Sequence, residues 1–279
     1  MFKKILLSGI ILFVSTLFFN YQAAAKVIDP STDPSENLPE KSGVYAVPGH
    51  PELRLRVFVH PTRDNHPGKP SVKPSPTPTP PPTLNCSLTD PGSDAVNDIT
   101  EWHLPSTFTY HLNTESVPVS VGSQNLGAIV GNSFNTWTSV VGNDVNIYPA
   151  GTTSQTRARY DGQNIISWGR ASSGTLGVTY TWYYTGSGLV AETDTIMNKG
   201  YPWSWSDPSS WGNNYCAYSG SFDAQNIMTH ELGHWFGVDD AYTADFKNNT
   251  MYGYGDVEET KKDTLTNGDI TAVQNIYPY

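Results

Sequence analysis

Two histidines and a glutamate stand at the spacing that a helix needs to gather them around one metal ion. His230 and His234 are four residues apart, and Glu231 directly follows the first histidine. Residues i and i+4 of a helix lie on one face, one turn apart, so both imidazoles point to the same side. Zinc binds imidazole nitrogens in a tetrahedral site that can keep one position for water. Glu231 can reach that position and accept a proton from the water as a general base.

The residues after the second histidine offer a turn and a third ligand. Gly237 stands three residues after His234, where the helix must stop, and glycine tolerates the left-handed conformation that such a turn needs. Asp240 stands three residues further on, and a carboxylate can bind zinc as imidazole does. Asp239 competes for this role, but the spacing from the glycine favours Asp240. The other aspartate would accept a hydrogen bond near the metal or belong to the turn.

This pattern, HExxHxxGxxD followed by Met251 in a tight turn, resembles the metzincin metallopeptidases, and their matrixin-like branch in particular. Metzincins more often have a histidine at position 240, and the aspartate here is similar to that of the snapalysin-type bacterial proteases. The stretch 265–277 looks like the tail of a matrixin catalytic domain, and the resemblance covers roughly residues 100–279. It implies zinc as cofactor, Met251 as a hydrophobic floor under the metal, and a protein or peptide substrate.

The resemblance also implies a cleft across the domain. The strand predicted at 177–184 would form its upper edge and pair with an extended substrate. Tyr252 and Tyr254 would line the specificity pocket or pack beside it. In some metzincins a tyrosine two residues after the methionine reaches the zinc, but here that residue is Gly253, so we expect no such fifth ligand.

The upper half of the domain departs from the vertebrate matrixins. None of the seven histidines lies between His111 and His230, so a three-histidine structural zinc site has no ligands there. No Pro-Arg-Cys-Gly motif precedes the domain, which argues against a cysteine-based latency. Asp161, Glu192 and Asp194 offer hard oxygen ligands that suit calcium, although turn and strand-surface roles explain the same residues. Calcium is therefore a second candidate cofactor beside zinc.

Hydrophobic periodicity predicts an α+β domain. Runs of alternating, β-branched or aromatic residues predict strands at 107–112, 145–148, 164–168, 177–184 and 193–198. Apolar residues from Leu126 to Trp137 recur about every 3.6 residues and predict a long helix, and another helix follows at 224–236. A capping-box pattern from Thr266 to Asp269 starts the last helix. With the resemblance, these elements indicate a metzincin-like catalytic domain: a twisted mixed β-sheet, a long helix, an active-site helix and a C-terminal helix.

The N-terminus has the features of a signal peptide at residues 1–25. Lys3 and Lys4 precede an apolar run, and small residues lead to a predicted cleavage after Ala25. The apolar run has about 15 residues, fewer than the roughly 20 that a spanning helix needs. We therefore expect a secreted, extracellular protein with no membrane attachment after signal cleavage.

Three further segments follow the predicted signal peptide. Residues 26–66 form a candidate pro-segment, in which 53–59 alternates apolar and basic residues as a strand does. Residues 67–84 are a Pro-rich linker, which cannot bury a core and should be extended. The zinc metallopeptidase catalytic domain is predicted at 85–279.

Export also decides how the two cysteines are interpreted. In an oxidising compartment, Cys86 and Cys216 most simply form one disulfide. The alternative makes Cys86 a thiolate that caps the metal in an inactive precursor. The net charge of −10 argues against nucleic acid and anionic membranes as partners, and we expect a monomer.

Three hypotheses for the function follow from these features. The first is a secreted zinc endopeptidase with Glu231 as general base. The second is an inactive module that binds extracellular protein or glycan through a surface rich in tyrosine and tryptophan. The third is a zinc hydrolase that acts on a small ester or amide.

Overall fold

The computed structural model describes residues 26–27, 38–63, 83–142, 144–212 and 214–278. The predicted signal peptide and nearly all of the predicted Pro-rich linker lie outside these residues. Within the described ranges, none of the helices has the length and apolar character needed to cross a bilayer.

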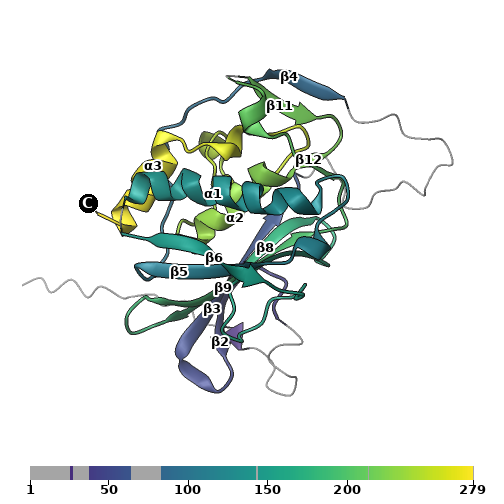
Figure 1. Cartoon of the computed structure of the whole chain (residues 1–279). Helices are drawn as coiled ribbons and strands as arrows, with labels where there is room; N and C mark the ends of the chain where they lie inside the picture. Colours follow the sequence, from purple (N-terminus) through teal and green to yellow (C-terminus); the bar gives the residue numbers. More distant parts are fainter. Residues whose placement is uncertain (1–25, 28–37, 64–82, 143, 213, 279) are drawn as a thin grey trace, which may run out of the picture.

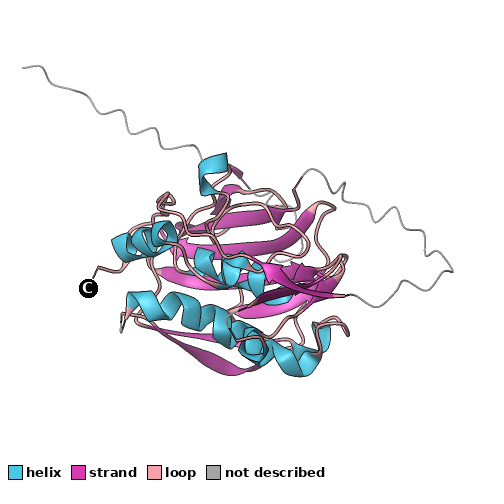
Figure 2. Cartoon of the chain, turned by 90° about the horizontal axis from the view of Figure 1, so that it is seen from above, coloured by secondary structure: helices cyan, strands magenta, loops and turns pink. Residues whose placement is uncertain are grey.

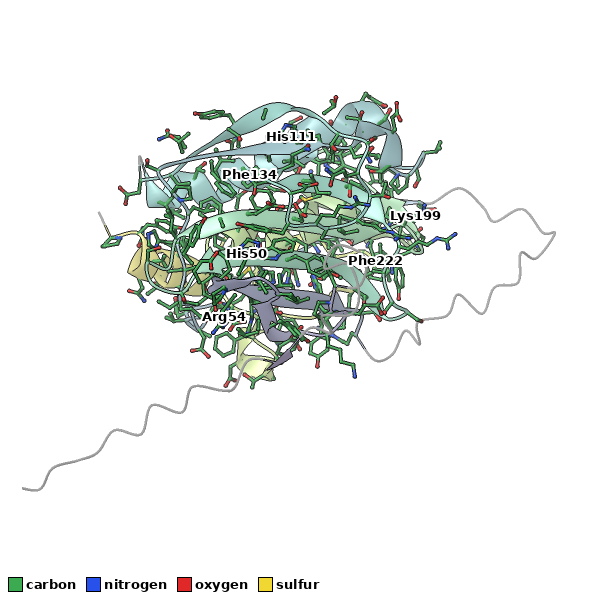
Figure 3. All side chains as sticks on the ribbon, turned by 90° about the horizontal axis from the view of Figure 1, so that it is seen from below. His50, Arg54, His111, Phe134, Lys199 and Phe222 are labelled. Carbon is green, nitrogen blue, oxygen red and sulfur yellow. A yellow bond between two sulfur atoms is a disulfide. The ribbon has the colours of Figure 1, made fainter. Side chains whose placement is uncertain are left out.

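An eight-stranded mixed sheet forms the centre of the molecule, with strand order β1-β2-β3-β8-β9-β7-β5-β6. Its strands are Lys26–Val27 (β1), Gly43–Val47 (β2), His50–Pro61 (β3), Thr107–Leu112 (β5), Asn146–Thr152 (β6), Ile165–Gly169 (β7), Thr175–Tyr184 (β8) and Val190–Asn198 (β9). β9, β7, β5 and β6 run parallel, whereas β3 and β9 are both antiparallel to β8. In Figure 3, Arg54 of β3 and His111 of β5 lie toward opposite edges of the sheet.

Three α-helices cover one face of this sheet (Figures 1 and 2). They are α1 (Leu126–Val141), α2 (Ala224–Trp235) and α3 (Asn267–Ile276). Short 3-10 turns are found at Thr114–Ser116, Ser123–Asn125, Pro208–Ser210, Ala244–Phe246 and Lys261–Asp263. The architecture is therefore the predicted α+β, metzincin-like one.

Two small β-ladders complete the structure. Leu84–Leu88 (β4) pairs antiparallel with Tyr215–Tyr218 (β11), and Trp203–Ser204 (β10) pairs parallel with Phe222–Asp223 (β12). A disulfide between Cys86 and Cys216 joins β4 to β11. The predicted pairing of the two cysteines is therefore present, and Cys86 is not a free thiol that could cap a metal.

The core positions α2 by packing it between α1 and the sheet. The apolar stripe of α1 is buried, including Leu126, Phe134 and Trp137, as the helical periodicity predicts. The indole Nε1 of Trp137 donates a 2.8 Å hydrogen bond to the Thr229 carbonyl of α2. On the sheet side, the indole of Trp235 donates to the Thr195 hydroxyl of β9 at 2.9 Å. These contacts fix the rotation of α2 about its axis.

One expectation about the sheet is wrong in this chain. We expect the strand at 177–184 to form the upper edge of a substrate cleft and to pair with an extended substrate, but β8 is an interior strand of the sheet because β3 pairs along its full length. The alternation at 53–59 explains this pairing, since Leu53, Leu55 and Val57 bury one face of β3 in an apolar cluster with Tyr180 and other residues. Three strands of the candidate pro-segment, β1, β2 and β3, thus extend the sheet.

Candidate metal centre

The three predicted zinc ligands, His230, His234 and Asp240, converge near the C-terminal end of α2. The Nε2 atoms of His230 and His234 lie 3.1 Å and 3.6 Å from Asp240 Oδ1, and all three atoms lie within 4.8 Å of one another. Each of these three atoms is buried and has no hydrogen-bond partner in the described structure. Buried polar atoms are rarely left unpaired, so a cluster of three nitrogen and oxygen atoms facing one point fits a bound cation.

Backbone carbonyls orient both imidazoles for metal binding. His230 Nδ1 donates to the Thr250 carbonyl at 2.8 Å, and His234 Nδ1 donates to the Val238 carbonyl at 2.9 Å. A carbonyl can only accept, so Nδ1 carries the hydrogen and Nε2 keeps its lone pair. Burial lowers the pKa of both rings, that of His234 to about 3, so both are neutral. Neutral imidazoles with a free Nε2 are the form that binds zinc.

The chain turns back toward the histidines at Gly237. The φ angle of Gly237 is +91°, and a Cβ there would lie 2.8 Å from the Trp102 carbonyl oxygen and 2.9 Å from Thr100 Oγ1. Both the backbone conformation and the lack of space require glycine. The predicted turn is thus present, and it brings the following aspartates to the metal centre.

The two aspartates after this turn have different partners. Asp240 presents Oδ1 to the histidines, and its Oδ2 accepts a 2.9 Å hydrogen bond from the Tyr242 hydroxyl. Asp239 instead accepts two hydrogen bonds from Arg56, at 3.0 and 3.1 Å, and one from the Asp240 amide. The structure therefore brings Asp240, rather than Asp239, to the histidines. No sequence signal marked Tyr242 or Arg56 as their partners.

Glu231 lies against β8, where two residues accommodate its carboxylate. Thr179 donates to Oε2 at 2.7 Å, and a Cβ on Gly177 would collide with Oε1, so glycine leaves room for the carboxylate. Oε1 itself is buried without a hydrogen-bond partner. Burial raises the pKa of Glu231 to about 8, although the Thr179 hydrogen bond lowers it. This carboxyl can exchange a proton near neutral pH.

Met251 packs against α2, in a turn that α3 holds in place. Its side chain is fully buried, and a Cβ on Gly233 of α2 would collide with its sulfur. The amides of Thr250 and Met251 donate to the two carboxylate oxygens of Asp269, at 2.9 and 3.2 Å. Asp269 also completes the capping box of α3 with Thr266. Asp269, which the sequence predicts as a capping residue of α3, thus also anchors the Met251 turn. The sequence did not predict this second contact.

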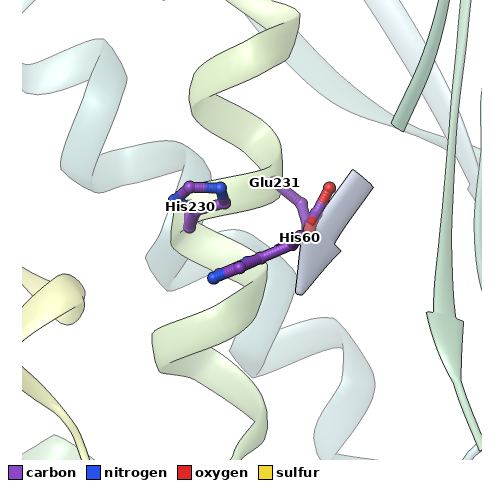
Figure 4. A group of neighbouring side chains, drawn as sticks. All are labelled: His60, His230 and Glu231. Atoms are coloured by element: carbon purple, nitrogen blue, oxygen red, sulfur yellow. Dashed lines mark ion pairs between the residues drawn. The ribbon is translucent and has the colours of Figure 1, made fainter. Parts of the chain in front are cut away.

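Three side chains of β3 also reach the centre, and none of them was predicted to do so. Arg56 binds Asp239, Phe58 stacks on His234, and His60 lies beside His230 and Glu231. His60, His230 and Glu231 form a second group whose ligand atoms lie within 4.8 Å of one another. Figure 4 shows His60 near the end of β3, beside the two α2 residues His230 and Glu231. No sequence pattern indicated these contacts, because they depend on how β3 pairs with β8.

The candidate calcium ligands are occupied by backbone amides. Glu192 accepts from the amides of Asp161 and Gly162, and Asp194 accepts from those of Arg159 and Ile165, at 2.6–3.1 Å. Within the described ranges, neither metal-ligating group includes these acids. Calcium binding at this place is therefore not supported. Burial raises the pKa of both carboxyls, that of Glu192 to about 7.

Comparison with known proteins agrees with the architecture and the residues of this centre. The sequence model of the matrixin family matches residues 101–278, which is more than half of the chain. The match includes α1, α2, α3 and the residues from His230 to Met251, but neither β2 nor β3. No curated protein matches the chain.

Proposed function

Because the chain belongs to the matrixin family, we propose that it is a secreted zinc endopeptidase that hydrolyses peptide bonds of extracellular proteins. One observation carries this proposal: the unpaired Nε2 atoms of His230 and His234 and the unpaired Oδ1 of Asp240 face one point. Two neutral imidazoles and one carboxylate are a donor set that zinc prefers, and three protein ligands leave a position for water. Zinc bound there would polarise a scissile carbonyl and acidify water.

Glu231 is the proposed general base. Its Oε2 is held by Thr179, so Oε1 is the oxygen that is free to move a proton. Oε1 accepts a proton from the attacking water and then delivers it to the nitrogen of the leaving amine. Burial raises the pKa of Glu231 to about 8, close enough to neutrality for the carboxyl both to accept and to return a proton.

Secretion is proposed from the signal-peptide features of residues 1–25 and from the Cys86–Cys216 disulfide, since such bonds persist in oxidising compartments. The net charge of −10 disfavours nucleic acid as a partner, and a protein or peptide is the proposed substrate of a monomeric enzyme.

Digestion of a denatured protein such as casein tests this function. The wild-type chain should cleave it, a zinc chelator should stop cleavage, and added zinc should restore it. Glu231→Ala should keep its zinc and lose about 10²–10⁴-fold in rate, because it lacks the base. The matched control is Glu115→Ala, an exposed glutamate on the Thr114–Ser116 turn, which should cleave as wild type does.

Two results would contradict the proposal. Cleavage that survives the chelator would exclude a metal-dependent mechanism, and unchanged turnover in Glu231→Ala would remove this residue from the role of base. A fully processed wild-type chain that holds zinc but cleaves neither protein nor peptide would instead support an inactive binding module. Hydrolysis of small esters without peptide cleavage would support the third hypothesis.

A further inference from the structure

A hollow of about 360 Å³ lies on the face of the sheet opposite to the metal centre. Val178 and Ile196, which pair across β8 and β9, form part of its lining. The residue after Val178 is Thr179, which bonds Glu231, and side chains alternate between the two faces along a strand. The hollow and the metal centre therefore lie on opposite sides of β8. Its volume is within the range of small-ligand pockets, about 300–1,000 Å³.

Hydrogen bonds to the sheet hold two walls of this hollow in place. One wall is the turn at 171–175, whose carbonyls accept hydrogen bonds from the side-chain amide of Asn198 at 2.7–3.4 Å. The other wall is the segment 156–158, which is fixed at its end because the Arg159 amide donates to the buried Asp194 at 2.8 Å. The shape of the hollow is therefore set by the fold, as in most small-ligand sites.

Apolar side chains form one part of the lining. Val178, Ile196 and Ala158 are buried members of the apolar cluster that covers one face of β3, and Leu38 packs against the same cluster. An apolar group of a ligand that filled the space beside them would be removed from water, which is the main driving force for binding such groups. This part of the hollow therefore favours a compact apolar group.

Two hydroxyl groups in the lining have no hydrogen-bond partner among the described residues. They belong to Tyr180 and Thr175, which are only 8% and 5% exposed. Hydroxyls that are buried to this extent are rarely left without a partner. A polar group of a ligand in the hollow would supply the missing hydrogen bonds.

The charged groups of the lining carry an excess of positive charge. Arg157 and Arg170 both line the hollow, and neither forms an ion pair or a hydrogen bond with a described residue through its side chain. Among the described lining residues the one carboxylate is that of Glu40, and it accepts a hydrogen bond from the Ser172 hydroxyl. Two positive charges and one negative charge leave +1, in a chain whose net charge is −10. This local excess favours an anion.

We propose that this hollow binds a carboxylate that carries a compact apolar group, as the C-terminus of a polypeptide or a free aliphatic acid does. The apolar group lies against Val178 and Ile196, and the carboxylate accepts hydrogen bonds from Arg157 and Arg170. Guanidinium groups match carboxylates well, because they donate two parallel hydrogen bonds. The net charge of +1 suits a monoanion better than a doubly charged phosphate. This site goes beyond the proposed peptidase function and uses none of the metal ligands.

Calorimetric titration of the full chain with three small probes tests the site. N-acetyl-leucine resembles a polypeptide C-terminus, N-acetyl-leucinamide lacks the charge, and hexanoate lacks the peptide group. N-acetyl-leucine should bind with a dissociation constant on the order of 0.1–1 mM, and its amide about 10-fold more weakly or less tightly still. Stronger binding of N-acetyl-leucine than of hexanoate would identify a polypeptide C-terminus as the ligand, and the reverse order a free aliphatic acid. Each titration is repeated with a chelator, because metal ions also bind carboxylates, and the constants should not change.

Single variants locate the groups that hold the carboxylate. Arg157→Gln and Arg170→Gln should each raise the dissociation constant of N-acetyl-leucine about 5-fold or more, since each removes a charge-assisted hydrogen bond. The matched control is Arg159→Gln: Arg159 is exposed on the same segment but does not line the hollow, so the constant should change by about 2-fold at most. Glu40→Gln should lower the constant about 2- to 5-fold, because it removes the negative charge from the lining.

Four results would overturn this site. They are no saturable binding of any probe below about 10 mM, equal binding of the acid and its amide, affinity that does not depend on Arg157 or Arg170, and binding that the chelator abolishes. The last result would place the carboxylate on the metal centre instead. Binding that survives the chelator, weakens in both arginine variants and persists in Arg159→Gln would establish the site. This outcome does not depend on whether the chain hydrolyses peptides, so the two proposals fail separately.

Discussion

Two buried polar clusters lie on opposite sides of β8 and β9, and they differ in how their polar atoms are satisfied. Around Glu192 and Asp194, backbone amides of the 159–165 loop donate to the carboxylates. Around His230, His234 and Asp240, one atom of each side chain faces the others with no hydrogen-bond partner in the described structure. Both clusters are almost completely buried.

The difference shows that burial and acidity do not by themselves mark a metal site. The acids at 192 and 194 replace water with amide donors, so these hydrogen bonds fix a loop to the sheet. The metal centre holds each imidazole through Nδ1 and Asp240 through Oδ2, and it leaves one atom of each side chain free. The cluster around the two histidines and Asp240 differs from the Glu192–Asp194 cluster in one feature: nitrogen and oxygen atoms without hydrogen-bond partners in the described structure converge there.

The largest expected effect is the loss of zinc in Asp240→Ala. This change removes one of three proposed ligands, so zinc affinity should fall well beyond the roughly 10–100-fold that loss of an outer partner causes. Metal analysis after dialysis checks this. Asp239→Ala is the matched control: Asp239 binds Arg56 instead, so its zinc content should stay at the wild-type level. Zinc loss in the control alone would reassign the third ligand.

A substitution in the Glu192–Asp194 cluster should lower the stability of the fold and leave the zinc content unchanged. Asp194→Ala leaves the buried amides of Arg159 and Ile165 without an acceptor, which should lower the free energy of unfolding by about 3 kcal/mol. Urea denaturation measures this loss, and zinc content should not change. Asp161→Ala, on the exposed side of the same loop, should lose less than about 1 kcal/mol. Zinc or calcium loss in Asp194→Ala would erase the distinction between the clusters.

The same cluster should make stability depend on pH. Burial raises the pKa of Glu192 from 4.5 to about 7, so between these values the folded chain keeps a proton that the unfolded chain has lost. Its contribution to the free energy of unfolding is therefore complete below about pH 4.5 and is lost as the pH rises through 7, by up to about 3 kcal/mol. Glu192→Gln cannot ionise, so its unfolding free energy should decrease less between pH 5 and pH 8. Equal decreases in wild type and variant would contradict the assignment.

The smallest effect is expected from the hydrogen bond that orients Asp240. Tyr242→Phe removes the donor to Oδ2 but no ligand, so zinc affinity should fall by about 10-fold. Competition with a chromophoric chelator measures this change. Tyr254→Phe is the control, because Tyr254 packs edge-to-face against Tyr242 in the same aromatic group. Equal losses in both variants would show that the hydrogen bond from Tyr242 to Asp240 does not specifically support the site.

The elements that carry the site could be predicted from local patterns. The periodicity of α1, the capping box of α3 and the spacing from His230 to Asp240 all appear in the structure at or near the expected residues. These features depend on residues within one or two turns of each other, and local rules describe them well. The order and pairing of the strands could not be predicted in the same way. The β3–β8 pair joins residues more than 100 positions apart, and its main-chain hydrogen bonds do not depend on residue type.

The sequence by itself determined which side chains are candidate metal ligands, because the histidine spacing, the glycine turn and the following aspartate are set by helix and turn geometry. Only the tertiary structure decided what surrounds them: Thr179, Gly177 and His60 beside Glu231, and Tyr242 on Asp240. These neighbours come from segments far apart in the chain, and the register of β3 on β8 brings His60 to α2. A shift of one residue would turn His60 to the other face of the sheet, so its contact with Glu231 is a property of the packing.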